Sequence, residues 1–307
     1  MIFSLIVPTI HRTSELSRLL TSIERQKLRS FSLKDVEIII VDQNSDDRVA
    51  RLLSDHAMLT CLHLRAPALG QSNAKNIGIQ HARGEYIAFP DDDCFYDPHT
   101  LETAYKLHLK LGKRVGLFGM ASDYETGSAL LRYPSHKRWI KSPKDGSVFL
   151  GLQICQFYPK DIVNHVKCFD NELCSGGRWG SGEETDFAIR ALQLGYTIQF
   201  NPELVVYHPF LNASSMPSAK LQHYGKGFGA LCKKHGLTSY FLRKTLKQLA
   251  GLLYYLFRLN SSRANTCLNL LKSRLIGYLS YDTSPDSTLT YKLQKADTTR
   301  PVCQKDR

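Results

Sequence analysis

The chain has 307 residues, enough for one large domain with an appendage, and its 43% hydrophobic and 22% charged residues exclude a disordered or collagen-like protein. The net charge of +12 is uneven, because 16 of the 40 Lys and Arg residues but only 4 of the 28 Asp and Glu residues follow residue 210. Residues 1–210 are therefore neutral, which argues against a uniformly basic coat and leaves a basic C-terminal segment to face phosphates of lipid or nucleic acid.

The cysteines and the N-terminus predict a location. The eight cysteines form no CxxC pair, so we interpret them as reduced thiols of a cytosolic protein and not as a zinc site. The opening MIFSLIVPTI has no basic residue before its apolar run and is interrupted by Pro8, which predicts a strand and not a signal peptide. We expect a cytoplasmic protein, with a peripheral position on the cytoplasmic face of the inner membrane as a further expectation.

Strands and helices alternate along the first ninety residues. Apolar runs predict buried strands over 2–7, 36–41, 59–64 and 86–89. Between them, helices are predicted over 14–23 and 72–81. This alternation predicts an α/β fold with a Rossmann-like, mostly parallel sheet flanked by helices. In such sheets ligands bind beyond the carboxyl ends of the strands.

A triplet of carboxylates follows the fourth predicted strand. Asp91, Asp92 and Asp93 come directly after Phe89 and Pro90. Adjacent carboxylates repel one another, and a hard cation such as Mg²⁺ or Mn²⁺ would offset that repulsion. The alternative is a solvated acidic turn, but a buried strand that leads straight into the triplet favours a metal site.

A second acidic cluster lies in the sequence GSGEETDF. Ser181 or Gly182 would cap a helix whose first turn carries acids, where the helix dipole favours negative charge. The structural alternative is that Glu183, Glu184 and Asp186 only stabilise this helix end, with Asp186 paired to Arg190 four residues later.

Several motifs together resemble family 2 glycosyltransferases with the GT-A fold. LIVPT, IIIVDQNSDD and ALGQSNAKNIGIQHARGEYIAFPDDDC resemble the N-terminal half of that family. FDNELCSGGRWGSGEETDFAIRALQLGYTIQFNPELVVYHP is similar to its acceptor-side half. The resemblance covers residues 1–210, implies a catalytic domain there, and is not specific to one sugar. It implies a nucleotide-diphosphate sugar as the donor.

The resemblance also implies a set of donor-binding residues. Pro8 and Thr9 would line the nucleoside pocket, and Asp42 would accept a hydrogen bond from the base. Lys75 and Asn76 would lie near the phosphates. The structural alternatives are a turn or cap residue for Asp42 and a surface lysine on a helix for Lys75.

In the family's DxD motif, the metal and the donor share the acidic triplet. Asp91 would contact the ribose or the metal shell, and Asp92 is the spacer beside the donor. Asp93 would bind Mg²⁺ or Mn²⁺ directly, and the metal would stabilise the departing nucleoside diphosphate. His208, in VVYHP, matches a histidine that approaches the metal or the diphosphate, and its alternative is a structural role.

The acidic helix would supply the general base. The family usually has Glu-Asp where this chain has Glu183-Glu184, and the second position implies Glu184 as the base. The longer side chain leaves Glu183 and Asp186 as alternatives. A single base without a second nucleophile implies inversion at the anomeric carbon. Trp179 would either stack on an acceptor sugar or anchor its loop.

The basic third is predicted to be helical over 211–282, with a polar tail over 283–307. The segment HYGKGFGALCKKHGL is expected to end the catalytic unit. Two amphipathic helices should follow, with leucine stripes over 242–256 and 268–279 and Lys and Arg largely beside them. Their stripes would pack on the catalytic domain, lie on an anionic membrane surface, or do both.

The leading hypothesis is a metal-dependent transferase that adds a sugar to a hydroxyl of a glycan or lipid-linked acceptor, for cell-surface polysaccharide or glycolipid synthesis. One alternative is a nucleotidyltransferase of similar fold, which the loop PTIHRTSE disfavours because it is not glycine-rich. The other is a non-catalytic carbohydrate- or nucleic-acid-binding protein. We expect no nucleic-acid partner, because basic and aromatic residues do not interleave and no reading helix is evident.

Overall fold

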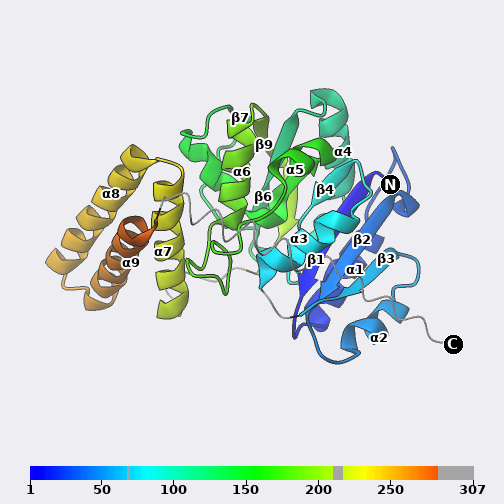
Figure 1. Cartoon of the computed structure of the whole chain (residues 1–307), viewed down its shortest axis with the longest axis horizontal. Coiled ribbons are helices and arrows are strands. Elements are labelled where there is room, and N and C mark those ends of the chain that lie inside the picture. Colours follow the sequence, from blue (N-terminus) through cyan, green and yellow to red (C-terminus); the bar gives the residue numbers. More distant parts are fainter. Residues whose placement is uncertain (68–69, 210–216, 283–307) are drawn as a thin grey trace.

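The computed structural model describes residues 1–67, 70–209 and 217–282. Figure 1 shows a central sheet between helices, with a group of three further helices at one end of the molecule. The predicted polar tail over 283–307 lies outside the described residues, as do residues 211–216 of the predicted basic region.

The N-terminal half of the sheet is parallel. The strands lie in the order β3, β2, β1, β4, and their bounds are β1 (Phe3–Thr9), β2 (Val36–Asp42), β3 (Thr60–Arg65) and β4 (Tyr86–Ala88). Every residue of β1 and β2 is buried, because these apolar segments are covered on both faces of the sheet. The predicted α/β architecture is confirmed in this half.

The other half of the sheet mixes directions. Strand β8 (Gln156–Pro159) lies antiparallel between β4 and β6 (Val115–Ser122), and β9 (Thr197–Tyr207) runs parallel to β6. The short strands β5 (Phe95–Tyr96) and β7 (Arg138–Ile140) pair antiparallel with β9. The strand-like segment that ends in VVYHP is therefore β9, and its end carries His208 back toward the acidic triplet.

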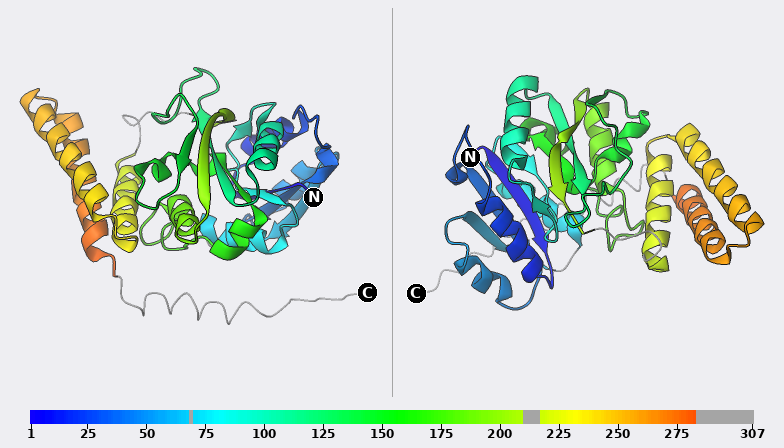
Figure 2. Two further views of the ribbon diagram at one scale, coloured as in Figure 1. Left: turned by 90° about the horizontal axis from the view of Figure 1, so that it is seen from above. Right: turned by 180° about the vertical axis from the view of Figure 1, so that it is seen from behind.

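Helices cover both faces of the sheet (Figure 2). One face packs against α1 (Ser14–Glu24), α2 (Arg48–Ser54) and α4 (Thr100–Leu111). The other face packs against α3 (Gln71–His81), α5 (Lys160–Val166) and α6 (Glu183–Gln193). Short 3₁₀ turns are formed by Leu33–Asp35, Gly146–Leu150 and Gln153–Cys155.

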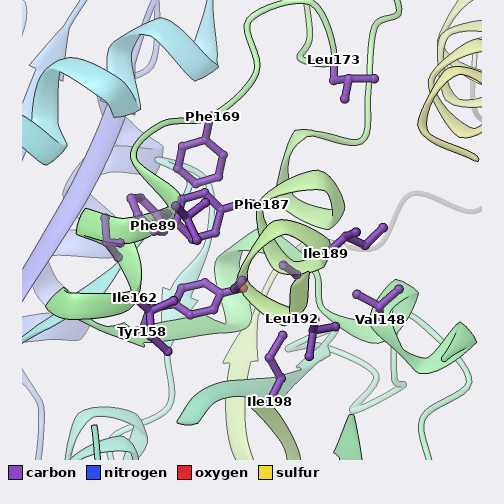
Figure 3. Close-up of a cluster of buried hydrophobic side chains, with 14 of the residues drawn as sticks. Phe89, Val148, Tyr158, Ile162, Phe169, Leu173, Phe187, Ile189, Leu192 and Ile198 are labelled. Atoms are coloured by element: carbon purple, nitrogen blue, oxygen red, sulfur yellow. The ribbon is translucent and has the colours of Figure 1, made fainter. Parts of the chain in front are cut away.

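An aromatic cluster holds the acidic helix α6 on the sheet (Figure 3). The ring centre of Phe169 lies 4.8 Å from that of Phe89, which follows β4, and 4.7 Å from that of Phe187 on α6. Tyr158 of β8 lies 5.2 Å from Phe187. These rings are buried, so the start of α6 is placed against the end of β4 by packing of large apolar side chains.

The C-terminal unit has three helices where two were expected. They are α7 (Ser218–Lys234), α8 (Thr238–Phe257) and α9 (Ser261–Ser280). Helix α7 includes most of the segment HYGKGFGALCKKHGL, and its residues Ala230, Leu231 and Cys232 join the core between the sheet and α3, α5 and α6. No described helix is long and apolar enough to cross a membrane.

Glycines let α7 and α9 approach each other closely. A methyl group on Gly229 would overlap the backbone oxygen of Arg274, and one on Gly277 would overlap the backbone oxygen of Lys226. The glycines that weaken α7 as an isolated helix are thus needed for its contact with α9.

Replacing Gly277 tests this close contact. Gly277→Ala should lower the free energy of unfolding by about 1–3 kcal/mol, because the methyl group forces the two helices apart. The matched control is Gly251→Ala in α8, where the nearest neighbour is Cys267 Sγ at 3.7 Å, and it should be neutral or stabilising by up to about 1 kcal/mol. Thermal denaturation measures both, and equal stabilisation by the two changes would contradict the close α7–α9 contact.

Candidate active site

A large cleft opens beyond the carboxyl ends of β1 and β4. Its volume is about 1090 Å³, and it is walled by strand ends, the loop before α6 and the first turns of α7. Eight of the residues with a predicted role line it: Pro8, Thr9, Asp91, Asp92, Asp93, Glu183, Glu184 and His208. The strand ends and the acidic helix therefore converge, as the parallel order of β1 and β4 requires.

Within the acidic triplet, the repulsion between Asp92 and Asp93 is offset by the protein itself. Arg12 Nη1 lies 2.8 Å from Asp92 Oδ1 and 2.5 Å from Asp93 Oδ2, and Thr9 Oγ1 donates to Asp92 Oδ2 at 2.8 Å. Burial raises the pKa of Asp92, against the opposing effects of Thr9 and Arg12. Burial also acts to raise the pKa of Asp93, but His208 and Arg12 outweigh it, so that this pKa is lowered. Two of the three carboxylates thus have cationic or hydroxyl partners without a metal.

Asp91 belongs to a second network, which reaches the acidic helix. Its Oδ1 accepts hydrogen bonds from Gln71 Nε2 at 2.5 Å and from Gln153 Nε2 at 3.0 Å. Gln153 Oε1 in turn accepts from the buried Lys75 ammonium, which lies 3.2 Å from Glu183 Oε1. Burial, opposed by Lys75, raises the pKa of Asp91 to about 6. The two acidic segments are therefore connected through one buried cation and one amide.

Asp93 and His208 provide two atoms that suit a divalent cation. Asp93 Oδ1 is buried, accepts no hydrogen bond from the described residues and lies 3.3 Å from His208 Nε2. His208 Nδ1 lies 2.8 Å from the carbonyl oxygen of Pro209, which can only accept, so the tautomer with its hydrogen on Nδ1 would present a lone pair on Nε2 to a cation. Burial acts to lower the pKa of His208, but Asp93 outweighs it and the pKa is raised, so a cation would have to displace a proton there. The predicted set of three ligands is not assembled, because Asp91 Oδ1 is held by amides, and the described residues contain no group of three or more metal-ligating side chains.

Helix α6 presents Glu184 to the cleft. Its N-cap is Gly182, whose φ of +112° lies in a region that glycine adopts readily, so the first turn starts directly at the two glutamates. Glu183 is 6% exposed and pairs with Lys75, whereas Glu184 is half-buried at the cleft wall. Burial, followed by the charge of Glu183, raises the pKa of Glu184 to about 8.

Asp186 lies away from the cleft and acts as a structural anchor. Its carboxylate contacts Arg190 Nε at 2.7 Å, Lys234 Nζ at 2.6 Å and His235 Nε2 at 2.8 Å. Burial acts to raise its pKa, but Arg190, His235 and Lys234 outweigh it and hold the pKa well below the usual range. The predicted pair with Arg190 is confirmed, and the alternative of Asp186 as base is not supported because Arg190, Lys234 and His235 occupy its carboxylate.

Lys75, Asn76 and Asp42 also lie outside the cleft lining. Lys75 is fully buried, which corrects the alternative of a surface lysine. Asn76 donates to the backbone oxygen of Phe169 at 3.0 Å and accepts from its nitrogen at 2.7 Å, so it fixes a loop. Asp42 is fully buried and accepts from His63 Nε2 at 2.9 Å and from the Asn44 backbone at 2.9 Å. These polar groups are satisfied within the protein, which argues against direct donor contacts.

Trp179 anchors its loop and does not line the cleft. It is 5% exposed, and its ring centre lies 5.5 Å from that of Tyr281. The cleft wall on this side comes instead from α7, which contributes Lys220, His223 and Tyr224. This part of the chain was expected to end the catalytic unit, so none of these residues was predicted to belong to the site.

Three further residues of the site were missed. Arg12 could have been found from its place just after the first strand end, next to Thr9, and Gln71 from its place near the start of a helix beside the cleft. Gln153 lies in a 3₁₀ turn before β8, and no sequence motif indicates its contact with Lys75 and Asp91.

Comparison with known proteins identifies the class. The model of "Glycosyl transferase family 2" matches residues 4–164, which is more than half of the chain. The chain therefore belongs to glycosyl transferase family 2, and the resemblance stated from its motifs is confirmed.

Particular relatives are distant. The chain is 24% identical to "Glycosyltransferase AglE" of Haloferax volcanii over 67% of this chain and 66% of that protein. It is 26% identical to "Uncharacterized glycosyltransferase YwdF" of Bacillus subtilis over 76% of this chain and 84% of that protein. The match to "Poly(ribitol-phosphate) beta-N-acetylglucosaminyltransferase TarS" of Staphylococcus aureus spans 33% of this chain and only 18% of TarS, at 28% identity.

Solved structures share the fold. S. aureus TarS 1–349 in complex with UDP-GlcNAc aligns with a TM-score of 0.58 at 15% identity, over 92% of this chain and 93% of that one. The mannosyltransferase PcManGT of Pyrobaculum calidifontis, in complex with GDP-Man and Mn²⁺, aligns with a TM-score of 0.55 at 16% identity, over 97% of this chain and 81% of that one. The expected GT-A fold is confirmed.

The structural role of Asp186 can be tested by an isosteric change. Asp186→Asn should lower the free energy of unfolding by about 3 kcal/mol, because Lys234 and Arg190 lose their buried counter-charge. The folded pKa of Asp186 lies below its usual 3.8, so this contribution is present above about pH 4 and is lost as the pH falls through the folded value. Denaturant unfolding of both proteins across pH measures it, and an unchanged stability at pH 7 would remove the anchor role.

Proposed function

We propose that the protein transfers a sugar from a nucleotide-diphosphate sugar to an acceptor hydroxyl, with Glu184 as the general base. The observation that carries this proposal is that the three acids at the start of α6 have different contacts within the protein. Glu183 and Glu184 both line the cleft, but Glu183 pairs with Lys75, and Asp186 is held by Arg190, Lys234 and His235. Glu184 has a pKa of about 8. A base whose pKa lies near the working pH transfers protons efficiently.

The reaction would be a single displacement. The acceptor hydroxyl gives its proton to Glu184 as its oxygen forms a bond to the anomeric carbon. The bond from that carbon to the phosphate oxygen breaks, and the nucleoside diphosphate leaves with the electron pair. Attack opposite to the leaving group inverts the anomeric configuration, and the proton leaves Glu184 to solvent afterwards.

The donor would bind on the β1 and β4 side of the cleft. Pro8 and Thr9 line that side together with Asp91, so they are placed to contact the nucleoside and ribose. Similar structures were solved with UDP, UDP-GlcNAc or GDP-Man, which supports a nucleotide sugar as the donor class. Asp92, fixed by Thr9 and Arg12, would shape this wall without binding the donor directly.

Mg²⁺ or Mn²⁺ would be held by Asp93 and His208. When bound, the metal would stabilise the negative charge that grows on the departing diphosphate. Two protein ligands suffice for such a cation, because it usually keeps water and substrate phosphates as its other ligands. Arg12 lies beside the same carboxylate and would add a second positive charge near the phosphates.

The acceptor would enter between α6 and α7. Lys220, His223 and Tyr224 of α7 line the cleft together with Glu184, and the charge of Glu184 helps to raise the pKa of Tyr224, after burial. We propose a glycan or lipid-linked acceptor of cell-surface synthesis. Relatives named for poly(ribitol phosphate) and for an undecaprenol-linked glycan support this class.

Replacing the proposed base should reduce the rate of sugar transfer without abolishing donor binding. Glu184→Gln should lower the rate of sugar transfer at least about a hundredfold, since general base catalysis is lost. In the folded wild type, the pKa of Glu184 is about 8, above its usual 4.5, so the ionised side chain destabilises the fold. The free energy of unfolding of the wild type should therefore fall as the pH rises from about 4.5 to about 8. The variant should therefore melt at a higher temperature than the wild type at pH 8. Transfer by the wild type should increase with pH up to about 8.

Glu183→Gln is the matched control. It removes the partner of buried Lys75 and should lower the melting temperature, in contrast to Glu184→Gln. Transfer assays with a panel of nucleotide sugars, together with thermal shift by the donor, give both readouts. Wild-type transfer by Glu184→Gln would refute the base assignment. Release of pyrophosphate from a sugar phosphate and a nucleoside triphosphate would support a nucleotidyltransferase instead.

Metal dependence gives an independent test. EDTA should abolish transfer, and Mn²⁺ or Mg²⁺ should restore it. Asp93→Asn and His208→Gln should each raise the Mn²⁺ concentration for half-maximal activity by about tenfold or more, a loss of about 1.4 kcal/mol in metal binding. Asp92→Asn is the control from the same triplet and should leave the Mn²⁺ requirement unchanged. Full activity in EDTA, or an equal effect of Asp92→Asn, would contradict the assignment.

A further inference from the structure

The helical hairpin of α8 and α9 carries a large apolar surface that the protein leaves uncovered. This surface, the leucine face, consists of Leu242, Leu246, Leu249, Leu253, Leu256, Phe257, Leu259, Leu268, Leu275 and Leu279. Their exposed fractions range from 37% to 92%. Exposed apolar patches of this extent on a folded protein mark an interaction surface. The leucine stripe of α8 therefore does not pack on the catalytic domain, which was one of the two predicted arrangements.

Helical periodicity places the two stripes on one side of the hairpin. On α9, Ser273 and Gly277 meet α7, while Leu271 is buried and Leu275 and Leu279 lie on the far side. On α8, Phe241 is buried against the other helices, whereas the leucines of the stripe lie on a neighbouring side of the helix that is exposed. Figures 1 and 2 show α8 and α9 as the outermost elements at this end, with α7 between them and the sheet.

The helices that carry the leucine face are positively charged. Arg243 neighbours Leu246 three residues on, Lys247 and Arg258 lie further round the exposed surface of α8, and Lys272 is exposed on α9. The sequence contains no acidic residue between Glu203 and Asp282, so nothing on these helices neutralises them. Burial together with Lys247, Arg243 and Arg274 lowers the pKa of Lys244, as expected within a cluster of like charges.

Exposed apolar side chains on helices that carry Lys and Arg and no acidic residue favour an anionic lipid surface over other occupants. A second copy of this chain would cover the leucines, but a symmetric contact would bring two positively charged helical units together. A nucleic acid would use the cations and leave the leucines exposed. We propose that the leucine face inserts into the headgroup region of an anionic bilayer, to which the positive charge of α8 and α9 is attracted.

Docking would also orient the active site, a consequence that rests on the proposed function. Helix α7 packs along α9 through Gly229 and Gly277, and its first turns bring Lys220 and Tyr224 to the cleft wall. The bilayer would therefore lie at a fixed position relative to the acceptor side of the cleft. An acceptor whose reactive hydroxyl is carried by a membrane-anchored lipid fits this arrangement.

Vesicle flotation with the full chain tests the proposal. The wild type should float with vesicles of phosphatidylglycerol and phosphatidylcholine in equal amounts, and not with phosphatidylcholine alone. The bound fraction should fall as salt rises from 0.05 to 0.5 M, because screening weakens the charge contacts. Absence of flotation with the anionic vesicles at low salt would overturn the proposal.

Two variants separate apolar from charge contributions. Leu246→Ser/Leu253→Ser should weaken binding to anionic vesicles by about tenfold or more, and Arg243→Gln/Lys247→Gln by about fivefold for each charge removed. Met58→Ser/Leu109→Ser is the matched control, because these apolar residues are similarly exposed, at 71% and 62%, on the catalytic domain. It should bind as the wild type does. Wild-type binding by the leucine variant would overturn the proposal.

Two other measurements identify a different occupant. Light scattering that shows a wild-type dimer, converted to a monomer by Leu246→Ser/Leu253→Ser, would replace the bilayer by a second copy. RNA binding that is lost in the arginine–lysine variant and kept in the leucine variant, without vesicle binding, would identify nucleic acid as the occupant in place of the bilayer.

A donor-induced thermal shift in Mn²⁺ tests the proposed function separately from the docking. If the donor stabilises the protein but vesicles do not bind it, docking alone is wrong; if vesicles bind it but no donor does, the proposed function alone is wrong.

Discussion

The buried ammonium of Lys75 is the interaction on which the site depends. A cation without solvent is stabilised only by close partners, and here these are Glu183 on α6 and Gln153 in the turn before β8. Gln153 also binds Asp91 at the end of β4. One buried charge thus fixes three separate segments relative to one another. Of the two glutamates that line the cleft, Lys75 pairs with Glu183, and Glu184 is the one proposed as the base.

Charge compensation extends from this centre to the C-terminal unit. Asp186, one turn from the cleft, is held by Lys234 at the end of α7 and by His235 after it. The segment EETD therefore gives each of its three carboxylates a different environment. Burial acts to raise the pKa of both Glu184 and Asp186, but at Asp186 the contacts with Arg190, His235 and Lys234 outweigh it, so the two pKa values shift in opposite directions. The same contacts that anchor α7 bring its first turns to the cleft wall.

Sequence patterns located the elements that are defined locally. The four strands and the helices α1 and α3 of the first ninety residues, the acidic triplet and the acidic first turn of α6 were predicted close to their observed positions, because buried strands and helix ends have local signals; the short helix α2 was not predicted. Helix α7 lies in the region predicted to be helical but was not predicted as a separate helix, because its glycines are unfavourable in an isolated helix and become suitable only where α9 approaches. The donor roles of Asp42 and Asn76 rested on the family pattern, and the structure gives both residues partners within the protein.

The sequence by itself determined the family, the α/β order and the residue types that can bind a donor and move a proton. These depend on composition and spacing, which are properties of short segments. Only the tertiary structure decided which acids of α6 pair with Lys75 and with Arg190 and Lys234, that Gln153 and Arg12 lie at the site, and that the leucine stripe stays uncovered. Each of these depends on contacts between residues far apart in the chain, whose burial and charge partners no local pattern encodes.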